Sequence, residues 1–170
     1  MLNEREMEDV MNLTYPGLQL LSRDTNFSRF LEKYRPGTLL ADERPVLGSF
    51  LGGGLAGRCR YAILSNRIEP AEWPASFAAG LAPSGHYKVL DVYRRLGKVQ
   101  ITLLHLPDGH WRFFEDVSTN VDDLLIEYTR KRFDSCLEAE PAEPLLDAHW
   151  RKTCANLIGM TDLGGMFPIE

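Results

Sequence analysis

The sequence predicts a two-layer α+β domain, in which an antiparallel sheet of about four strands carries N- and C-terminal helices packed on one face. The first observation is a meander over 87–117, YKVLDVYRRLGKVQITLLHLPDGHWRFFEDV, with three strand-like runs separated by two turn sequences. Consecutive strands joined by tight turns pair antiparallel. The second observation is that helical patterns stand on both sides of this meander. We expect residues 1–170 to form a single domain, as chains of this length usually do.

The N-terminal part predicts two helices, over about 3–14 and about 26–35. Asn3 can cap the first helix, and the sequence Tyr-Pro-Gly stops it. Apolar residues recur at helical spacing in both segments, which predicts that each buries one stripe. These residues are Met7, Val10 and Met11 in the first helix, and Phe27, Phe30, Leu31 and Tyr34 in the second.

Residues 48–58, GSFLGGGLAGR, have an unusual glycine content and contain the pattern G-x-G-x-x-G at Gly52, Gly54 and Gly57. The dinucleotide-binding form of this pattern needs a helix directly after it, whose N-terminus meets the phosphates. The residues that follow, CRYAILS, predict a strand over 59–64 instead. We therefore interpret the segment as a flexible connection or a bulged hairpin.

Arg58 and Arg60 flank the start of that strand, where they could hold an anion or simply be solvated. A short helix is expected over about 71–80, docked through Trp73 and Phe77, which stand one turn apart.

The C-terminal part predicts two further helices. The first starts at Thr119 or Asn120 as the cap, and the second covers about 145–158. The residues expected to be buried are Val121, Leu124, Leu125 and Tyr128 in the first helix, and Leu146, Trp150, Cys154 and Leu157 in the second. The tail after Gly159 is irregular but apolar, and we expect it to cross a groove on this chain or on another.

The turns set the register of the meander. Pro107-Asp108-Gly109 is typical of a type I turn with a glycine bulge, and the first turn can take the same form. A two-residue turn at Leu96-Gly97 is the alternative, and a slip of one residue would flip the first strand. In the bulge register, one face of the meander is more apolar than the other, and we expect this face to lie under the helices. It carries Tyr87, Val89, Asp91, Tyr93, Val99, Ile101, Leu103, His105, Trp111, Phe113, Glu115 and Val117.

Three polar residues on this face, Asp91, His105 and Glu115, are the candidate catalytic residues. Desolvation raises the pKa of a buried carboxyl group, and such groups often serve as general acids and bases. One carboxylate would act as the base, the other as acid or orienting group, and His105 as a third member. The alternative is structural: the carboxylates pair with arginines, and His105 is a satisfied core residue. The candidate ligand-binding residues around them are Tyr87, Tyr93, Trp111 and Arg58.

No metal site or cofactor is predicted. The register sends His105 and His110 to opposite faces, and none of the three cysteines fits a zinc or nucleophile signature. An odd number of cysteines and an N-terminus without signal-peptide character predict a cytoplasmic protein with reduced thiols. No apolar run is long enough to span a membrane.

Two functions follow as alternatives. The first is a non-enzymatic protein-interaction module, such as an adaptor, chaperone-like factor or inhibitor, that binds a protein partner or forms a homodimer. The second is a small-ligand-binding protein or acid/base enzyme with a pocket between sheet and helices. The formal net charge of −5 argues against nucleic acid as a partner, because an acidic surface repels phosphate.

Overall fold

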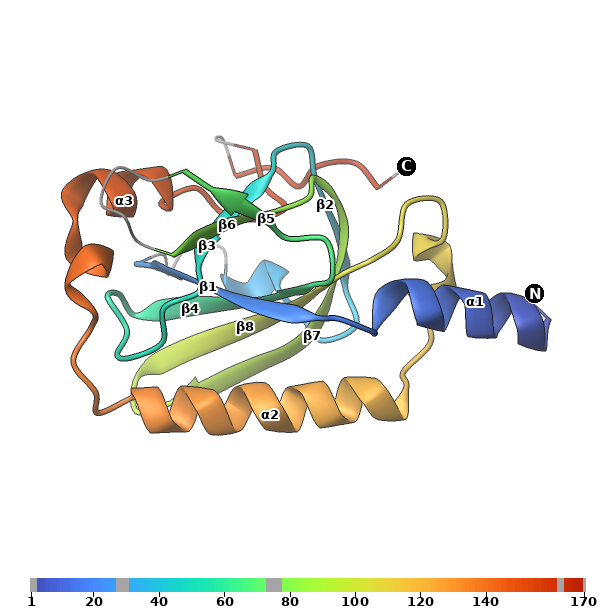
Figure 1. The fold of residues 1–170 in the computed structure, drawn as a ribbon, viewed down its shortest axis with the longest axis horizontal. Coiled ribbons are helices and arrows are strands. Elements are labelled where there is room, and N and C mark those ends of the chain that lie inside the picture. The colour runs from blue at the N-terminus through green and yellow to red at the C-terminus, as the bar shows by residue number, and fades with distance from the viewer. Residues whose placement is uncertain (1–2, 27–30, 73–77, 162–163, 170) are drawn as a thin grey trace.

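The computed structural model describes residues 3–26, 31–72, 78–161 and 164–169. Within them the chain forms a mixed sheet of eight strands (Figure 1). The strands are β1 (Gln19–Thr25), β2 (Leu39–Asp42), β3 (Val46–Ser49), β4 (Cys59–Ser65), β5 (Glu69–Ala71), β6 (Ala79–Ala82), β7 (Gly85–Arg95) and β8 (Lys98–His105). Their order is β2-β7-β8-β4-β1-β3-β6-β5, and β4 pairs with β8 in parallel while the other neighbours are antiparallel.

The expected fold, a sheet of about four antiparallel strands with all helices on one face, is wrong. The strand expected over 59–64 and the first two strands of the meander are confirmed as β4, β7 and β8. The third is absent, because a 3-10 helix, η2 (Trp111–Phe114), begins directly after the turn. Five strands were not predicted: β1, which has seven residues, and β2, β3, β5 and β6, which have only three or four each. Such short strands show too few alternations to stand out in a sequence.

The sheet curls around one apolar core. Leu40 of β2 and Val46 of β3 lie five strand positions apart in the sheet, yet they belong to the same buried cluster. Tyr61 and Ile101 from the central strands occupy the middle of it. The C-terminal segment closes the core, with Ile158 fully buried. The sheet is therefore a half-barrel with a filled interior rather than a flat layer.

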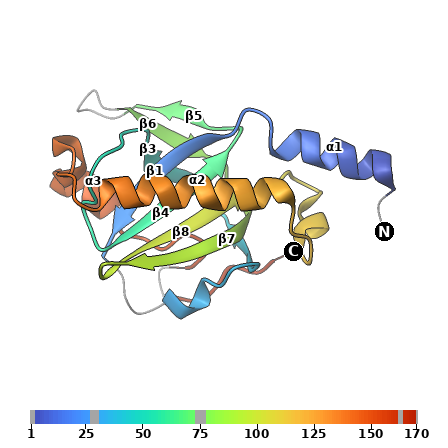
Figure 2. The ribbon, with the colours of Figure 1, turned by 90° about the horizontal axis from the view of Figure 1, so that it is seen from below.

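The described residues also form three α-helices and three 3-10 helices. They are α1 (Glu4–Thr14), η1 (Leu31–Lys33), η2, α2 (Asn120–Cys136), η3 (Glu143–Leu146) and α3 (Ala148–Thr153). The two views show α2 running across the outer face of the sheet beside β7 and β8 (Figures 1 and 2). α3 lies at one end of the sheet, on the left of both views. α1 extends away from the sheet in both views.

Helix capping was predictable, whereas helix length was not always so. Asn3 and Thr119 form the capping boxes of α1 and α2, as expected. The last predicted helix is instead divided into η3 and α3. Leu146, which was expected to be buried, is 48% exposed, whereas Leu145 is buried; Trp150 and Cys154 are buried as expected.

Two predicted helices fall partly or mainly outside the described residues. In the one over about 26–35, the described part holds the 3-10 helix η1. For the one over about 71–80, the docking residues Trp73 and Phe77 lie outside, and β5 and β6 stand at its two ends.

The pairing of β7 with β8 has features of both predicted turns, the two-residue turn and the bulged turn. The turn itself has two residues, Leu96 and Gly97, with φ of 51° and 75°, between the paired Arg95 and Lys98. A bulge at Leu90 then shifts the register between Val89 and Asp91. Because of this bulge the far half of the strand keeps the expected pairs, such as Tyr87 with His105, while the near half is shifted by one residue.

Candidate functional site

Asp91 lies on the outer face of the sheet, where α2 covers it, and not on the apolar inner face as expected. Its carboxylate accepts two hydrogen bonds from Arg130 of α2, both of 2.7 Å. The guanidinium also lies over the ring of Tyr93, 4.7 Å from its centroid. The Tyr93 hydroxyl in turn donates to Asp134. Asp91 therefore has the structural arrangement that the sequence left as the alternative, a carboxylate paired with a helix arginine.

His105 lies on the inner face, 4% exposed and in edge contact with the ring of Tyr87. Its Nε2 atom has no hydrogen-bond partner among the described residues. Burial lowers the pKa of the imidazole to about 4, and the neighbouring Asp108 opposes this only in part. The ring is thus neutral at pH 7. Its Nε2 atom, without a partner in the described part of the chain, differs from the satisfied core histidine that the sequence left as the alternative.

The remaining predicted residues are dispersed. Glu115 is exposed at the end of η2, and Trp111 stacks on His86 with ring centroids 4.6 Å apart. Arg58 is exposed beside the end of β1, where its backbone N–H donates to Asn26. The structure does not bring these residues together with Asp91 and His105 in one cavity.

The glycine-rich segment is held by a buried ion pair. Arg60 of β4 donates to Asp24 of β1 at 2.7 and 3.0 Å, and the two side chains are only 4% and 7% exposed. The same guanidinium donates to the carbonyls of Gly53 and Gly54. Asp24 also accepts the backbone N–H of Ala56. Arg60, one of the two arginines considered for anion binding, is therefore already committed to this loop.

Two of the three pattern glycines are needed for close packing. A Cβ at Gly54 would lie 1.8 Å from the carbonyl oxygen of Ala139, and one at Gly57 would lie 2.6 Å from that of Thr25. Gly54 also donates its N–H to the Glu140 carbonyl. The segment is thus a tightly packed loop between β3 and β4, and its glycines have a structural explanation.

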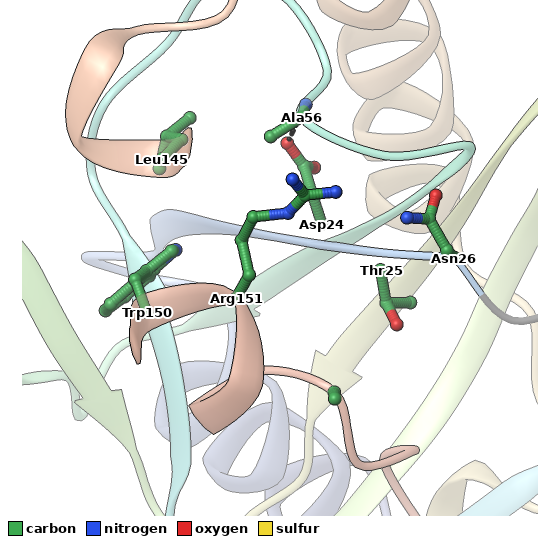
Figure 3. Close-up of a pocket in the computed structure, with 8 residues that line it drawn as sticks. Asp24, Thr25, Asn26, Ala56, Leu145, Trp150 and Arg151 are labelled. Carbon is green, nitrogen blue, oxygen red and sulfur yellow. Dashed lines mark hydrogen bonds between the residues drawn. The ribbon is translucent and has the colours of Figure 1, made fainter. Parts of the chain in front are cut away.

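A pocket of about 340 Å³ with a mixed polar and apolar lining opens beside this loop, at the end of β1 (Figure 3). Arg151 reaches from α3 toward Asp24 and Ala56, with Trp150 and Leu145 on one side and Thr25 and Asn26 on the other. The lining residues are Asp24, Thr25, Asn26, Ala56, Leu145, Trp150, Arg151 and Ala155. The pocket combines a guanidinium, a carboxylate, a hydroxyl and an amide, which suits a small polar ligand.

A second, larger and more apolar hollow of about 660 Å³ lies between α1 and η2. We call it the α1–η2 groove. Its apolar lining comes from Met7, Phe113 and Val117, and its polar lining from Glu6, Gly109, His110 and Arg112. Met7 is 41% exposed, and the buried residues of α1 are Val10 and Thr14.

Two residues of the expected apolar stripe of α2, Leu124 and Tyr128, face solvent, while Leu125 packs against a buried apolar cluster. Leu124 is 65% exposed and Tyr128 is 49% exposed, whereas the helix buries Asp122, Thr129 and Phe133. The expectation that Leu124 and Tyr128 pack on the sheet is therefore wrong.

Polar side chains on the outer face of the sheet explain this orientation of α2. Gln100 donates to the Thr129 carbonyl, and the hydroxyls of Thr102 and Thr129 lie 3.2 Å apart. Buried polar groups need such partners, so α2 turns Thr129 toward these two residues. The same side of the helix also buries Phe133 and packs Leu125 and Ile126 on an apolar cluster. The buried, polar Gln100 and Thr102 were the available signal for this orientation.

Cys59, Cys136 and Cys154 form no disulfide, and Cys59 and Cys154 are buried. Burial raises the pKa of both thiols, to about 11 for Cys154, which disfavours the reactive thiolate. Within the described ranges, no three His, Cys, Asp or Glu side chains gather closely enough to hold a metal ion. None of the described helices has the length and apolar character needed to cross a membrane.

Comparison with known proteins places the chain in no family. No family model matches it, and no curated protein does. Among solved structures, it is similar to exoenzyme S from Pseudomonas aeruginosa, solved in complex with human 14-3-3 protein beta and carba-NAD, at 13% identity and a TM-score of 0.46. That match covers 71% of this chain and 64% of the other.

A second similar structure is the type III effector XopAI from Xanthomonas axonopodis pv. citri, at 13% identity and a TM-score of 0.42. That match covers 54% of this chain and 42% of the effector. The chain thus matches less than two thirds of the length of either protein. With TM-scores below 0.5, these similarities carry no argument about function.

Proposed function

We propose that the chain is a non-enzymatic protein-interaction module, and that its partner docks in the α1–η2 groove. The observation that supports this most is the position of α1. A capping box stabilises the start of the helix, yet only two of its eleven residues are buried. The helix therefore holds Met7 at the edge of an apolar hollow without packing it into the core.

The lining of the groove has the composition of a docking site. Met7, Phe113 and Val117 form an apolar centre, and Glu6 and Arg112 stand among the polar residues beside it. Interfaces commonly have an apolar core within a polar rim, and methionine adapts to partners of different shape. The dispersed positions of Asp91, His105 and Glu115 give no comparable support to acid/base catalysis.

A photoreactive amino acid at position 7 tests the proposal in cells that produce the protein naturally. Irradiation is expected to give an adduct of discrete mass. An excess of unlabelled wild-type chain should suppress this adduct, whereas an excess of the Met7→Lys chain should not. The matched control carries the probe at Asn12, which is exposed on another face of the same helix. Equal labelling from both positions, or suppression by both chains, would contradict the proposal.

Binding of a small ligand is the second candidate, and the pocket in Figure 3 favours it. Its guanidinium, Arg151, suits a carboxylate or phosphate. Inorganic phosphate and succinate are suitable probes in a thermal unfolding series. A rise in melting temperature that disappears in Arg151→Met would support this function. A rise that persists in Arg151→Met, or none in the wild type, would count against it.

A further inference from the structure

The tip of the β7–β8 hairpin gathers four cations around one apolar side chain. Arg95 and Lys98 are paired on the two sides of the turn, and Arg94 precedes them. Arg58 joins them from the loop before β4, because its carbonyl accepts a backbone N–H of β8 at 3.0 Å. We call these four residues, together with Leu96, the basic tip. It stands at the end of the sheet opposite to α1, so it is separate from the α1–η2 groove (Figures 1 and 2).

Three of the four cations have no hydrogen-bond or ion-pair partner for their side chains within the described residues. They are Arg58, Arg94 and Lys98. The fourth, Arg95, donates to Asp134 of α2 at 2.7 Å. Arg95 and Lys98 also stand directly opposite one another, and like charges in such a cross-strand pair repel. The arrangement therefore costs the folded chain stability unless an anion binds there.

Two carboxylates on the elements beside the basic tip are already engaged. Asp134, the acidic partner of Arg95, also accepts a hydrogen bond from the Tyr93 hydroxyl. Asp24 on β1 is bound by Arg60 in the buried ion pair. Neither carboxylate is available to neutralise the three remaining cations. These cations therefore leave a local positive charge on a chain whose formal net charge is −5.

The apolar residue of the basic tip, Leu96, has no structural explanation in the fold. It is 73% exposed in the turn between Arg95 and Lys98, with φ of 51°. A residue with a side chain is strained at positive φ, and this side chain stabilises no core. An apolar side chain within a polar rim is, however, the usual arrangement at the centre of a protein interface.

A short acidic segment of a protein fits this surface better than an extended polyanion does. Charges interact over about 8–10 Å at physiological salt, so a short segment meets only the basic tip, whereas a membrane or a nucleic acid also meets the acidic remainder of the surface. The basic tip contains no aromatic side chain on which a base could stack. A single exposed leucine is also little apolar surface for binding a bilayer. Guanidinium groups, in contrast, bind carboxylates through two parallel hydrogen bonds.

We propose that the basic tip is a second docking surface, and that its partner is a protein segment in which acidic residues flank an apolar one. Leu96 packs on the apolar side chain of this segment. Arg58, Arg94 and Lys98 bind its carboxylates. This inference goes beyond the proposed function, because the basic tip and the α1–η2 groove share no residue.

Fluorescence anisotropy with a labelled peptide, in which two leucines stand between runs of glutamate, tests this surface. The wild-type chain should bind the peptide, and added salt should weaken the binding because it screens the charges. Arg58→Gln with Lys98→Gln should lower the affinity by about tenfold or more. The matched control is Arg5→Gln with Arg67→Gln, which removes the same charge from exposed positions outside the basic tip. This control should bind like the wild type.

Leu96→Asn separates binding from folding. Its melting temperature should rise, because asparagine adopts positive φ more readily than leucine in this turn. Its affinity for the peptide should nevertheless fall by about tenfold, because the contact loses an apolar side chain. Met7→Lys, in the α1–η2 groove, should bind the peptide like the wild type. The two proposals can therefore fail separately.

Several results would overturn the inference. One is a wild-type chain that does not bind the peptide, and another is equal weakening in the two double variants, which would reflect net charge alone. A Leu96→Asn chain that binds like the wild type would exclude Leu96 as the apolar contact. Tighter binding to vesicles containing phosphatidylserine, or to single-stranded DNA, than to the peptide would assign the basic tip to a membrane or a nucleic acid instead.

Discussion

Asp24 and Arg60 form an ion pair in the outer face of the sheet, with 2.7 Å between the Asp24 Oδ1 and Arg60 Nε atoms and both side chains nearly inaccessible to water. The pair joins β1 to β4 and also carries the glycine-rich loop through the carbonyls of Gly53 and Gly54. One side of the pocket at the end of β1 is therefore formed by a charge pair that is structural.

Asp24→Asn should destabilise the protein by about 3–5 kcal/mol, because it leaves the buried Arg60 charge without a counter-ion. The free energy of unfolding in urea, followed by tryptophan fluorescence, measures this effect. Glu127→Gln is the control, since it removes an exposed pair with Lys131 and should change stability by less than about 0.5 kcal/mol. Equal effects of the two substitutions would show that the Asp24–Arg60 pair is not a principal support of the loop.

Gly54→Ala should destabilise the protein by more than about 2 kcal/mol, whereas Gly52→Ala should be nearly neutral. The new Cβ would lie 1.8 Å from the Ala139 carbonyl oxygen at position 54, but 3.8 Å from the end of the flexible Arg132 side chain at position 52. Urea midpoints of the two variants provide the comparison. If both substitutions are tolerated equally, the loop does not pack on residues 139–140 as described.

Two other glycines, Gly48 in β3 and Gly80 in β6, show how far the sequence alone could predict the fold. Segments with strong local signals were predictable, including α1 with its cap at Asn3, β4, and the hairpin of β7 and β8. The short strands β3 and β6 were not, because Gly48 and Gly80 in them have no side chain to show alternation. A Cβ at either glycine would approach Leu21 within 3.0 Å, so their requirement comes from tertiary packing that the sequence does not display.

The candidate site was less predictable for a related reason. The face of the sheet on which Asp91 lies depends on where the extra residue of the hairpin is placed, in the turn or within β7. The structure has the extra residue within β7, as a bulge at Leu90, and Asp91 therefore lies on the outer face. The α2 stripe of Leu124 and Tyr128 has the spacing of a buried stripe. It is exposed because Gln100 and Thr102 present a polar surface that selects the opposite side of the helix.

Stability should fall as the pH decreases from 6.5 toward 4, and His105 should account for part of the fall. Burial lowers the pKa of folded His105 to about 4, below its ordinary value of 6.5. Between these values the unfolded chain binds a proton that the folded chain does not, so acid favours unfolding. The contribution is fully present above pH 6.5, and the expected loss approaches about 3 kcal/mol near pH 4.

Urea unfolding at several pH values measures this dependence. His105→Gln should flatten the fall in stability between pH 6.5 and 4. His149→Gln, at an exposed position of α3, should leave the slope unchanged. An identical slope in wild type and His105→Gln would mean that His105 is protonated as readily in the folded chain as in the unfolded chain.

Leu96→Asn should stabilise the protein by about 0.5–1 kcal/mol. Leu96 has φ of 51° and is 73% exposed, and Gly97 follows it with φ of 75°. Positive φ at both central residues is the type I′ geometry of two-residue hairpins, for which Asn-Gly is the preferred sequence. Leucine pays for this conformation in backbone strain and gains no burial. Thermal unfolding should give a higher melting temperature for Leu96→Asn and a lower one for Leu96→Val, since a β-branched residue disfavours positive φ more strongly. The opposite ranking would contradict the two-residue turn, and with it the position of the bulge that directs Asp91 toward α2.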